Sequence, residues 1–242
     1  MYLKNDRKLL CRKIIVMATT IMLGIMIPTT TVFAQTGNIS QQIFYSTNDK
    51  PYNLTYGQWT AKWWQWLLSI PKDSNPGGDN TGKYCNQGQS GPVWFLTGTY
   101  GGPNIRSCTV PAGKAILLPP INTECSYAEY PNLKTESELK TCAKTITDKV
   151  SLIEVTVDGV KLQNSEVSRV QSPIFPILFG PGNIYGLKSG NTQGVSDGYW
   201  VFLKPLPIGN HEIHSKGVSV DYTTTSTNNF ISDVTYHLTV KG

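Results

Sequence analysis

A cluster of four tryptophans within eight residues restricts the fold of this chain more than any other feature. The cluster consists of Trp59, Trp63, Trp64 and Trp66. Three of them recur at the spacing of one helical face, and Leu67 and Ile70 continue that face. A buried tryptophan removes about 150–250 Å² of side chain from water. The segment is therefore expected to be a helix that packs against a large apolar surface.

Capping signals indicate where this helix begins and ends. Thr55 and Gln58 have the spacing of a capping box, in which both side chains satisfy backbone amides that the helix leaves free. Pro71 cannot continue a helix, so the sequence predicts one over residues 56–69. Its aromatic face either covers the side or end of a β-structure or forms a platform for sugar rings or a partner protein. In the second interpretation all four tryptophans are candidate ligand-binding residues, and Trp64 is the best placed because it lies at the edge of the face.

The first 34 residues have the layout of a secretory signal peptide. A basic segment ending at Lys13 precedes an apolar run from Ile14 to Ile27, and the residues before Gln35 suit cleavage after Ala34. Retention of this segment as an anchor helix is the alternative. No later stretch is apolar enough to span a membrane, so the mature chain is expected to be secreted and extracytoplasmic.

The charge of the mature chain argues against one class of function. The whole chain has a formal charge of +5, but the first 34 residues hold five of the 21 Lys and Arg residues and one of the 16 Asp and Glu residues. The remainder has 16 basic and 15 acidic side chains and is nearly neutral. Nucleic-acid binding needs a basic surface, so nucleic acid is not an expected partner.

Four cysteines follow the N-terminal segment: Cys85, Cys108, Cys125 and Cys142. An even number in a secreted chain indicates disulfides, with three pairings open. We favour Cys85–Cys108 and Cys125–Cys142, because neighbours in sequence close the shortest loops. Zinc ligation is the alternative, but no Cys-x-x-Cys or Cys/His spacing supports it. Separately, Asn38 and Asn53 each begin an N-glycosylation pattern, which makes both of them candidate modification sites.

Most of the remaining sequence has the pattern of β-strands. Alternating apolar residues over 234–240 and the Asp-Gly hairpin signal at 158–159 are the clearest cases. A second capped helix is predicted over 136–147. The expected fold is mainly β: one antiparallel β-sandwich domain over residues 35–242, immunoglobulin-like or jelly-roll-like, with two short α-helices. A domain boundary near residue 148 is the alternative.

Four segments carry a resemblance to a known family. They are the Trp-rich segment 59–66 (W-T-A-K-W-W-Q-W) with Ile70-Pro71, the segments 91–98 (G-P-V-W-F-L-T-G) and 106–113 (R-S-C-T-V-P-A-G), and 196–199 (S-D-G-Y). In these segments the chain resembles a family of secreted prokaryotic proteins that have a Trp-rich N-terminal helix and no assigned activity. The resemblance covers most of the mature chain. It implies a shared secreted scaffold and nothing about chemistry.

Two further patterns correspond to catalytic or metal-binding motifs. The sequence around Ser196, Gly-Val-Ser-Asp-Gly, matches the nucleophile elbow of hydrolases. Because an apolar strand rather than a helix follows it, a glycine-flanked β-turn is the favoured interpretation. His211 and His214 would lie on opposite faces of a strand, so they make a weak case for a metal site, even with His237 on a neighbouring strand.

Oxygen-bearing side chains offer the remaining candidate chemistry. The loop over 73–80 holds the hard ligands that calcium prefers, Asp73, Asn75, Asp79 and Asn80, but without EF-hand spacing. Calcium is therefore the candidate cofactor of this loop, and otherwise none is expected. Glu124, Glu129, Asp197 and Asp221 are candidate carboxylates for glycoside hydrolysis, which requires a pair about 5–9.5 Å apart.

These observations favour a secreted, disulfide-stabilised binding or structural protein of the cell exterior rather than an enzyme. Carbohydrate, such as an envelope polymer, is the preferred ligand class, and a surface protein is a further candidate partner. The alternative is a secreted hydrolase that uses carboxylates or Ser196.

Overall fold

The structure is a computed structural model in which residues 43–220 and 229–242 are described. The predicted signal peptide of residues 1–34, its cleavage site at Ala34 and Gln35, and also Asn38 and Asp221 lie outside the described residues. In the described part, no helix is long and apolar enough to cross a lipid bilayer. The extent of the mature domain, from residue 35 onward, stays a prediction.

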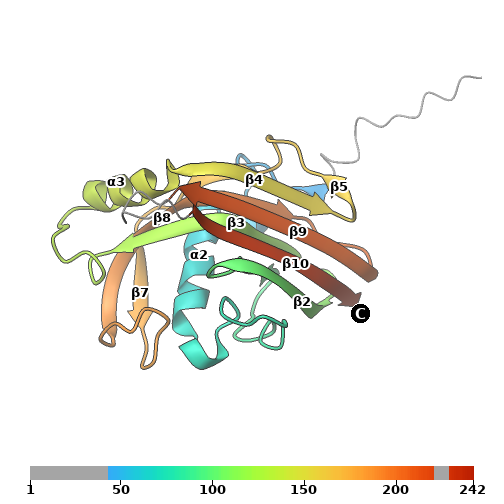
Figure 1. Cartoon of the computed structure of the whole chain (residues 1–242), viewed down its shortest axis with the longest axis horizontal. Coiled ribbons are helices and arrows are strands. Elements are labelled where there is room, and N and C mark those ends of the chain that lie inside the picture. The colour runs from blue at the N-terminus through green and yellow to red at the C-terminus, as the bar shows by residue number, and fades with distance from the viewer. Residues whose placement is uncertain (1–42, 221–228) are drawn as a thin grey trace, which may run out of the picture. The chain divides into compact units, whose positions relative to one another are not determined.

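The described part is mainly β with two α-helices of the predicted extent (Figure 1). The helices are η1 (Pro51–Asn53), α2 (Tyr56–Ser69), η2 (Lys72–Ser74) and α3 (Glu136–Thr147). The strands are β1 (Val93–Phe95), β2 (Gly102–Pro111), β3 (Ala115–Ser126), β4 (Val150–Val157), β5 (Val160–Lys161), β6 (Ser168–Gln171), β7 (Phe175–Phe179), β8 (Gly190–Leu203), β9 (Gly209–Val220) and β10 (Asn229–Lys241). Both α-helices begin with the predicted capping box, so both helix predictions are confirmed.

The strands form two five-stranded sheets. The first has the order β1-β3-β8-β6, with β7 also paired to β8, and the second has the order β2-β10-β9-β4-β5. β1 pairs with β3 in parallel, and β2 pairs with β10 in parallel, whereas the other pairs are antiparallel. The sheets are therefore mixed, and the expectation of a purely antiparallel sandwich is wrong. This strand order confirms neither the immunoglobulin-like nor the jelly-roll-like topology.

Strands from both sides of residue 148 pair within each sheet. β3 pairs with β8 in the first sheet, and β2 pairs with β10 in the second. These pairings join segments that lie more than 60 residues apart in sequence. The fold of the described residues thus depends on contacts between distant parts of the chain.

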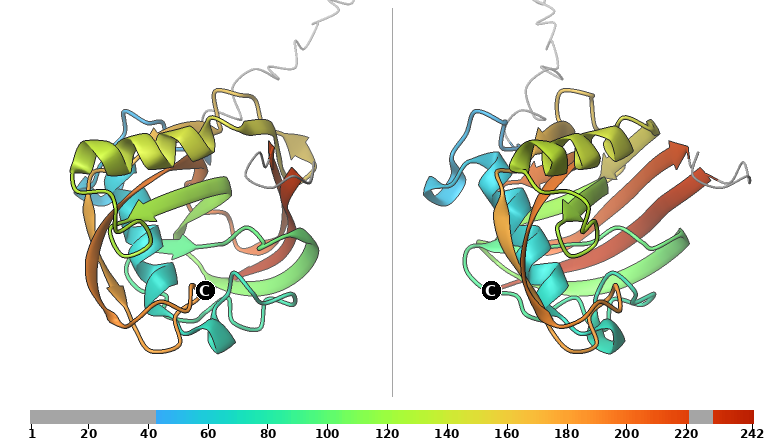
Figure 2. Two further views of the ribbon diagram at one scale, coloured as in Figure 1. Left: turned by 60° about the vertical axis from the view of Figure 1, so that its left-hand side comes forward. Right: turned by 90° about the vertical axis from the view of Figure 1, so that its left-hand side faces the viewer.

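The first sheet lies between the second sheet and α2 (Figure 2). Along β3, Ile116 and Leu118 pack with residues of the second sheet, whereas Ala115 and Leu117 pack with the tryptophans of α2. β8 alternates in the same way. Because both faces are buried there, residues 115–118 of β3 and 200–203 of β8 are continuously apolar rather than alternating polar and apolar.

All four tryptophans of α2 are buried, with exposed fractions of 2–7%. Three of their indole N–H groups donate to backbone carbonyls: Trp59 to Pro51, Trp63 to Leu96 and Trp66 to Gln87, at 2.7–2.9 Å. Trp64, expected at the edge, is only 5% exposed. The helix therefore presents no open aromatic platform, and its aromatic side chains form a layer of the core.

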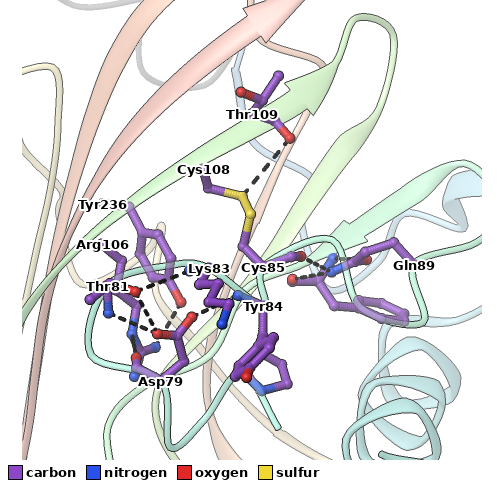
Figure 3. The surroundings of a disulfide bond; sticks show 12 residues. Asp79, Thr81, Lys83, Tyr84, Cys85, Gln89, Arg106, Cys108, Thr109 and Tyr236 are labelled. Atoms are coloured by element: carbon purple, nitrogen blue, oxygen red, sulfur yellow. Dashed lines mark hydrogen bonds between the residues drawn. A yellow bond between two sulfur atoms is a disulfide. The ribbon is translucent and has the colours of Figure 1, made fainter. Parts of the chain in front are cut away.

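Both favoured disulfide pairings are confirmed. Cys85 bonds to Cys108, which fastens the loop after α2 to β2 (Figure 3), and Cys125 bonds to Cys142, which fastens α3 to β3. The Cα atoms of each pair lie 5.9 and 6.2 Å apart, within the usual range. Two such bonds are typical of an oxidising compartment, and they support an extracellular, stabilised protein.

The hairpin turn between β4 and β5 favours the charged form of a histidine. Asp158 and Gly159 have the positive φ values of a type I′ turn, as predicted. In this turn Asp158 contacts the Nδ1 of His211 at 2.8 Å, and the carbonyl of Pro207 accepts from Nε2 at 2.9 Å. Burial disfavours the imidazolium, but these acceptors outweigh burial and raise the pKa of His211.

We expect this histidine to make stability depend on pH. Because its folded pKa is above the unfolded value, its contribution is complete below about pH 6.5 and is lost as the pH rises through the folded pKa. Thermal unfolding between pH 5.5 and about 8.5 should thus show a falling Tm, and His211→Gln should flatten the curve. His237→Gln, on the exposed face of β10, is the matched control. Parallel curves for the wild type and His211→Gln would contradict the prediction.

Candidate functional site

A row of polar side chains crosses the α2-facing side of the first sheet, next to a bulge in β3. The register of β3 against β8 shifts between Leu118 and Ile121, around two prolines. Beyond the shift, Asn122 pairs with Gly198 and Glu124 pairs with Ser196. Paired residues on neighbouring strands share a face, so three polar side chains come together there.

Two glycines of β8 make room for this row. A Cβ atom at Gly198 would lie 2.5 Å from Cβ of Asn122, and one at Gly194 would lie 3.1 Å from Oε2 of Glu124 and 2.6 Å from Ile177. A larger residue at either position would therefore displace the polar side chains. The Gly-x-Ser-x-Gly pattern serves close packing between strands.

This placement corrects the interpretation of Ser196. The residue lies inside β8, not in a β-turn, and is fully buried. Its hydroxyl has no hydrogen-bond partner among the described residues, so no general base activates it. A nucleophile elbow also requires a sharp turn into a helix, which a strand interior does not provide.

A pocket of about 180 Å³ opens beside this row, between α2, β3 and the loops that carry Tyr100 and Tyr185. Its aromatic walls are Trp63, Trp64, Tyr100 and Tyr185, with Phe230 on another side. Tyr100, Tyr185 and Phe230 are at least 38% exposed and mark the mouth, whereas Trp63 and Trp64 are buried. The pocket is smaller than the roughly 300–1,000 Å³ of drug-sized ligand sites, so it has room for a single ring.

Buried polar atoms without a partner gather at this pocket and beside it. In the described part, the Nε1 of Trp64 and the Nδ2 of Asn122, both from pocket-lining residues, make no hydrogen bond. The two carboxyl oxygens of Glu124 and the hydroxyl of Ser196 also have no hydrogen-bond partner there. Buried polar groups in native proteins almost always have partners. The concentration of such atoms here, donors and acceptors together, is the strongest sign of a binding site.

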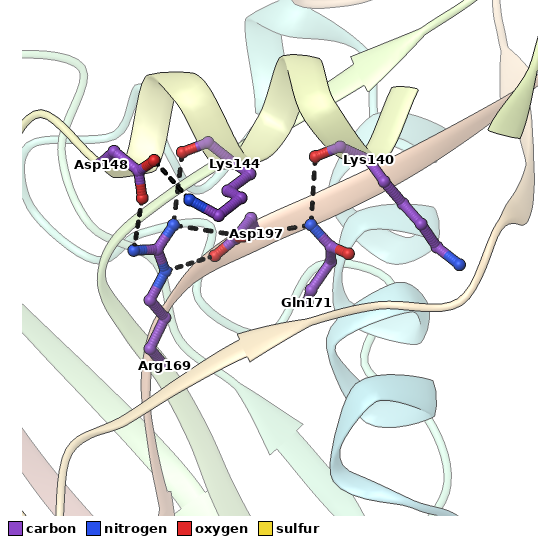
Figure 4. A network of polar contacts seen from close by, with 6 residues as sticks. All are labelled: Lys140, Lys144, Asp148, Arg169, Gln171 and Asp197. Carbon is purple, nitrogen blue, oxygen red and sulfur yellow. Dashed lines mark hydrogen bonds and ion pairs between the residues drawn. The ribbon is translucent and has the colours of Figure 1, made fainter. Parts of the chain in front are cut away.

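Glu124 lies against a second carboxyl group. Burial raises the pKa of Glu124 well above its usual range, and the neighbouring carboxyl group of Glu129 raises it further. Both carboxyl oxygens of Glu124 are unbonded in the described part, so no hydrogen bond joins the two groups. Asp197, another candidate carboxylate, is held by Arg169 at 3.0 Å and by Gln171 at 3.2 Å, on the α3 side of β8 (Figure 4). No arrangement among these residues supports the hydrolase alternative.

A buried arginine fixes the wall of the pocket. Arg106 is 1% exposed and donates to the carbonyls of Gly77, Thr97 and Gly98, all three of which line the pocket. It also donates to the hydroxyl of Tyr236 at 2.8 Å. Figure 3 shows Arg106 and Tyr236 beside Asp79 and the disulfide. These contacts hold two loops and β10 in one position.

The loop proposed for calcium uses its oxygen atoms internally. Asn75 donates to the carbonyls of Leu67 and Ile70 and accepts from Gly77 and Tyr100, and Asp79 accepts from the amides of Thr81 and Tyr84. Burial acts against the charge of Asp79, but these amides lower its pKa. The other two residues proposed there, Asp73 and Asn80, are exposed. Calcium in this loop stays a prediction without a supporting contact.

The histidines and the glycosylation candidate are separate from the pocket. His214 contacts Asp233 at 2.9 Å, and His237 lies 3.5 Å from Glu212. Within residues 43–220 and 229–242, no group of three His, Cys, Asp or Glu side chains is arranged to hold a metal ion. Asn53 is exposed in η1, and its glycosylation stays a prediction.

Comparison with known proteins adds little to this description. No model of a protein family matches the chain, and no curated protein matches it. One solved structure, titled "Solution Structure of Amebosin", aligns over 62% of this chain and 100% of its own, with 14% identity and a TM-score of 0.21. A likeness at this level carries no argument about fold or function. The resemblance to secreted prokaryotic proteins with a Trp-rich helix stays a prediction.

Proposed function

We propose that this protein is an extracellular binding protein that holds one sugar ring, such as the terminal unit of an envelope polymer, in the pocket between α2 and β3. The observation that carries the proposal is the combination of aromatic walls with two unpartnered donors, Nε1 of Trp64 and Nδ2 of Asn122. A sugar ring has an apolar face that packs on aromatic rings and a rim of hydroxyl groups that accept such hydrogen bonds. The two disulfides support the extracellular location.

The size of the pocket limits the ligand. About 180 Å³ takes one ring and excludes a buried oligomer. The exposed rings of Tyr100 and Phe230 at the mouth leave space for the rest of a chain to extend into solvent. A polymer is therefore expected to bind by its end rather than along its length.

The test is a titration of the disulfide-bonded protein with neutral and acidic monosaccharides and with oligosaccharides from isolated envelope polymers, followed by calorimetry. Trp64→Phe keeps an aromatic ring but removes the N–H group, so affinity should fall about five- to tenfold, the net value of one buried hydrogen bond. Asn122→Ala should have a similar effect.

Trp94→Phe is the matched control. The Nε1 of Trp94 is also buried without a partner in the described part, but its ring lies between the two sheets and does not line the pocket. This variant should bind like the wild type. The proposal fails if no saccharide binds, or if Trp64→Phe and Trp94→Phe have the same affinity.

A further inference from the structure

Two glutamates meet at the end of β3 in an arrangement that the sugar pocket does not explain. Glu124 belongs to β3 and is 4% exposed, whereas Glu129 follows the strand and is partly exposed. The charge of Glu129 acts on Glu124 and raises its pKa, so the two carboxyl groups are neighbours, and Ser126, on the same face of β3 as Glu124, contacts Glu129. Ser126 donates to Oε2 of Glu129 at 2.6 Å and so fixes that side chain. Two carboxyl groups this close do not both ionise unless a positive charge is present.

Within the described residues, no side chain provides that charge. Neither Glu124 nor Glu129 forms an ion pair with a Lys, Arg or His there. Arg169, on β6 beyond β8, contacts Asp197 and Asp148 on the α3 side of the first sheet. The described side chains therefore do not supply the positive charge that ionisation of both carboxyl groups requires.

A serine hydroxyl faces the pair and has no partner in the described part. Ser196 lies directly across from Glu124 in the β3–β8 register, so its side chain is on the same face. Its hydroxyl is fully buried and unbonded in the described part, as are both oxygens of Glu124. A single shared proton would satisfy one contact between the glutamates and leave the serine hydroxyl unbonded. A cation with its water ligands satisfies all of these oxygens.

We propose that Glu124, Glu129 and Ser196 hold a hard divalent cation of the calcium type. Carboxylate and hydroxyl oxygens are the ligands that this class of ion prefers, and water completes its six to eight positions. The partly exposed Glu129 leaves a route from solvent to the buried oxygens of Glu124. With only two carboxylates the affinity should be that of extracellular calcium modules, with a Kd of about 10⁻⁴–10⁻³ M.

The cation site does not depend on the proposed sugar binding, and its test uses the metal ion alone. The disulfide-bonded protein, stripped with a chelator, is titrated with CaCl₂ up to about 10 mM while Tm is recorded. Terbium luminescence, excited through the nearby tyrosines and tryptophans, reports occupancy independently of folding. Calcium should raise Tm and should displace terbium.

Glu129→Gln is the principal variant, because its side chain is partly exposed and the change keeps its shape. It should weaken calcium binding at least tenfold and abolish the Tm shift. Glu212→Gln, an exposed carboxylate of β9 in the other sheet, is the matched control and should bind like the wild type. If Glu129→Gln does not fold, terbium binding and its displacement by calcium in the wild type still decide the question. No Tm shift and no terbium signal in the wild type, or unchanged binding by Glu129→Gln, would overturn the proposal.

Discussion

Trp63→Ala should lower the free energy of unfolding by about 3–5 kcal/mol, the largest effect expected from a single truncation in α2. The side chain is 2% exposed and packs edge-to-face against Trp64, Trp66 and Trp200, with ring centroids 5.1–5.9 Å apart. Its removal would leave a cavity between α2 and the first sheet. It would also remove the donor that the Leu96 carbonyl accepts at 2.7 Å. Chemical denaturation followed by far-UV circular dichroism measures the change.

Trp64→Ala is the matched comparison, because the two residues are neighbours and equally enclosed. Trp64 is 5% exposed, makes no hydrogen bond in the described part and already borders a pocket. Its truncation should therefore cost about 1 kcal/mol less than that of Trp63, the value of the missing hydrogen bond. Equal costs, or a loss below about 1 kcal/mol for Trp63→Ala, would contradict the account of α2 as a core layer.

The helices and disulfides could be predicted because their signals are local. Capping boxes at Thr55 and Thr135 and the helical spacing of the tryptophans lie within single turns of chain. The direction of strand pairing has no such local signal. β1 and β3 are parallel because β2, which lies between them in sequence, belongs to the other sheet. Only the three-dimensional path of the chain decides this.

The apolar stretches of β3 and β8 are a sequence signal for burial on both faces of a strand. A search for alternating polar and apolar residues does not detect this signal. In residues 115–118 and 199–203, polar and apolar residues do not alternate as they do in a strand with one solvent-exposed face. This pattern indicates strands covered on both sides, and the Trp-rich helix is the natural second cover. Together, these features could have predicted three layers instead of a two-sheet sandwich with helices beside it.

The candidate site could not be predicted because it depends on register. Glu124 and Ser196 lie 72 residues apart and become neighbours only after β3 shifts its pairing around Pro119 and Pro120. A shift of one residue would turn Glu124 to the other face of the sheet. The glycines on either side of Ser196 in β8 are a signal that the sequence does contain. Their pattern matched a catalytic motif, however, whereas in the structure these glycines make room for side chains of β3.

Arg106→Met should also destabilise the protein, by about 3–5 kcal/mol, because several buried acceptors lose their donor. The guanidinium is buried, and its donors contact the carbonyls of Asp79 at 2.6 Å and Gly77 at 3.0 Å, the carbonyl and hydroxyl of Thr97 at 3.2 and 2.7 Å, and the carbonyl of Gly98 at 3.0 Å. It also lies over the ring of Tyr236. Methionine fills a similar volume but cannot donate hydrogen bonds. Each buried acceptor that loses its donor lowers the free energy of unfolding.

Arg106→Lys separates charge from geometry. Lysine keeps the positive charge but lacks the planar fork that reaches several carbonyls at once, so it should recover only part of the lost stability. Because the same carbonyls belong to pocket-lining residues, a folded Arg106→Lys protein should also bind saccharide more weakly than the wild type. Equilibrium denaturation and calorimetry measure the two effects. Full recovery of stability by lysine would show that the charge, and not the fork of donors, holds the two loops together, and the account of the pocket wall would then be wrong.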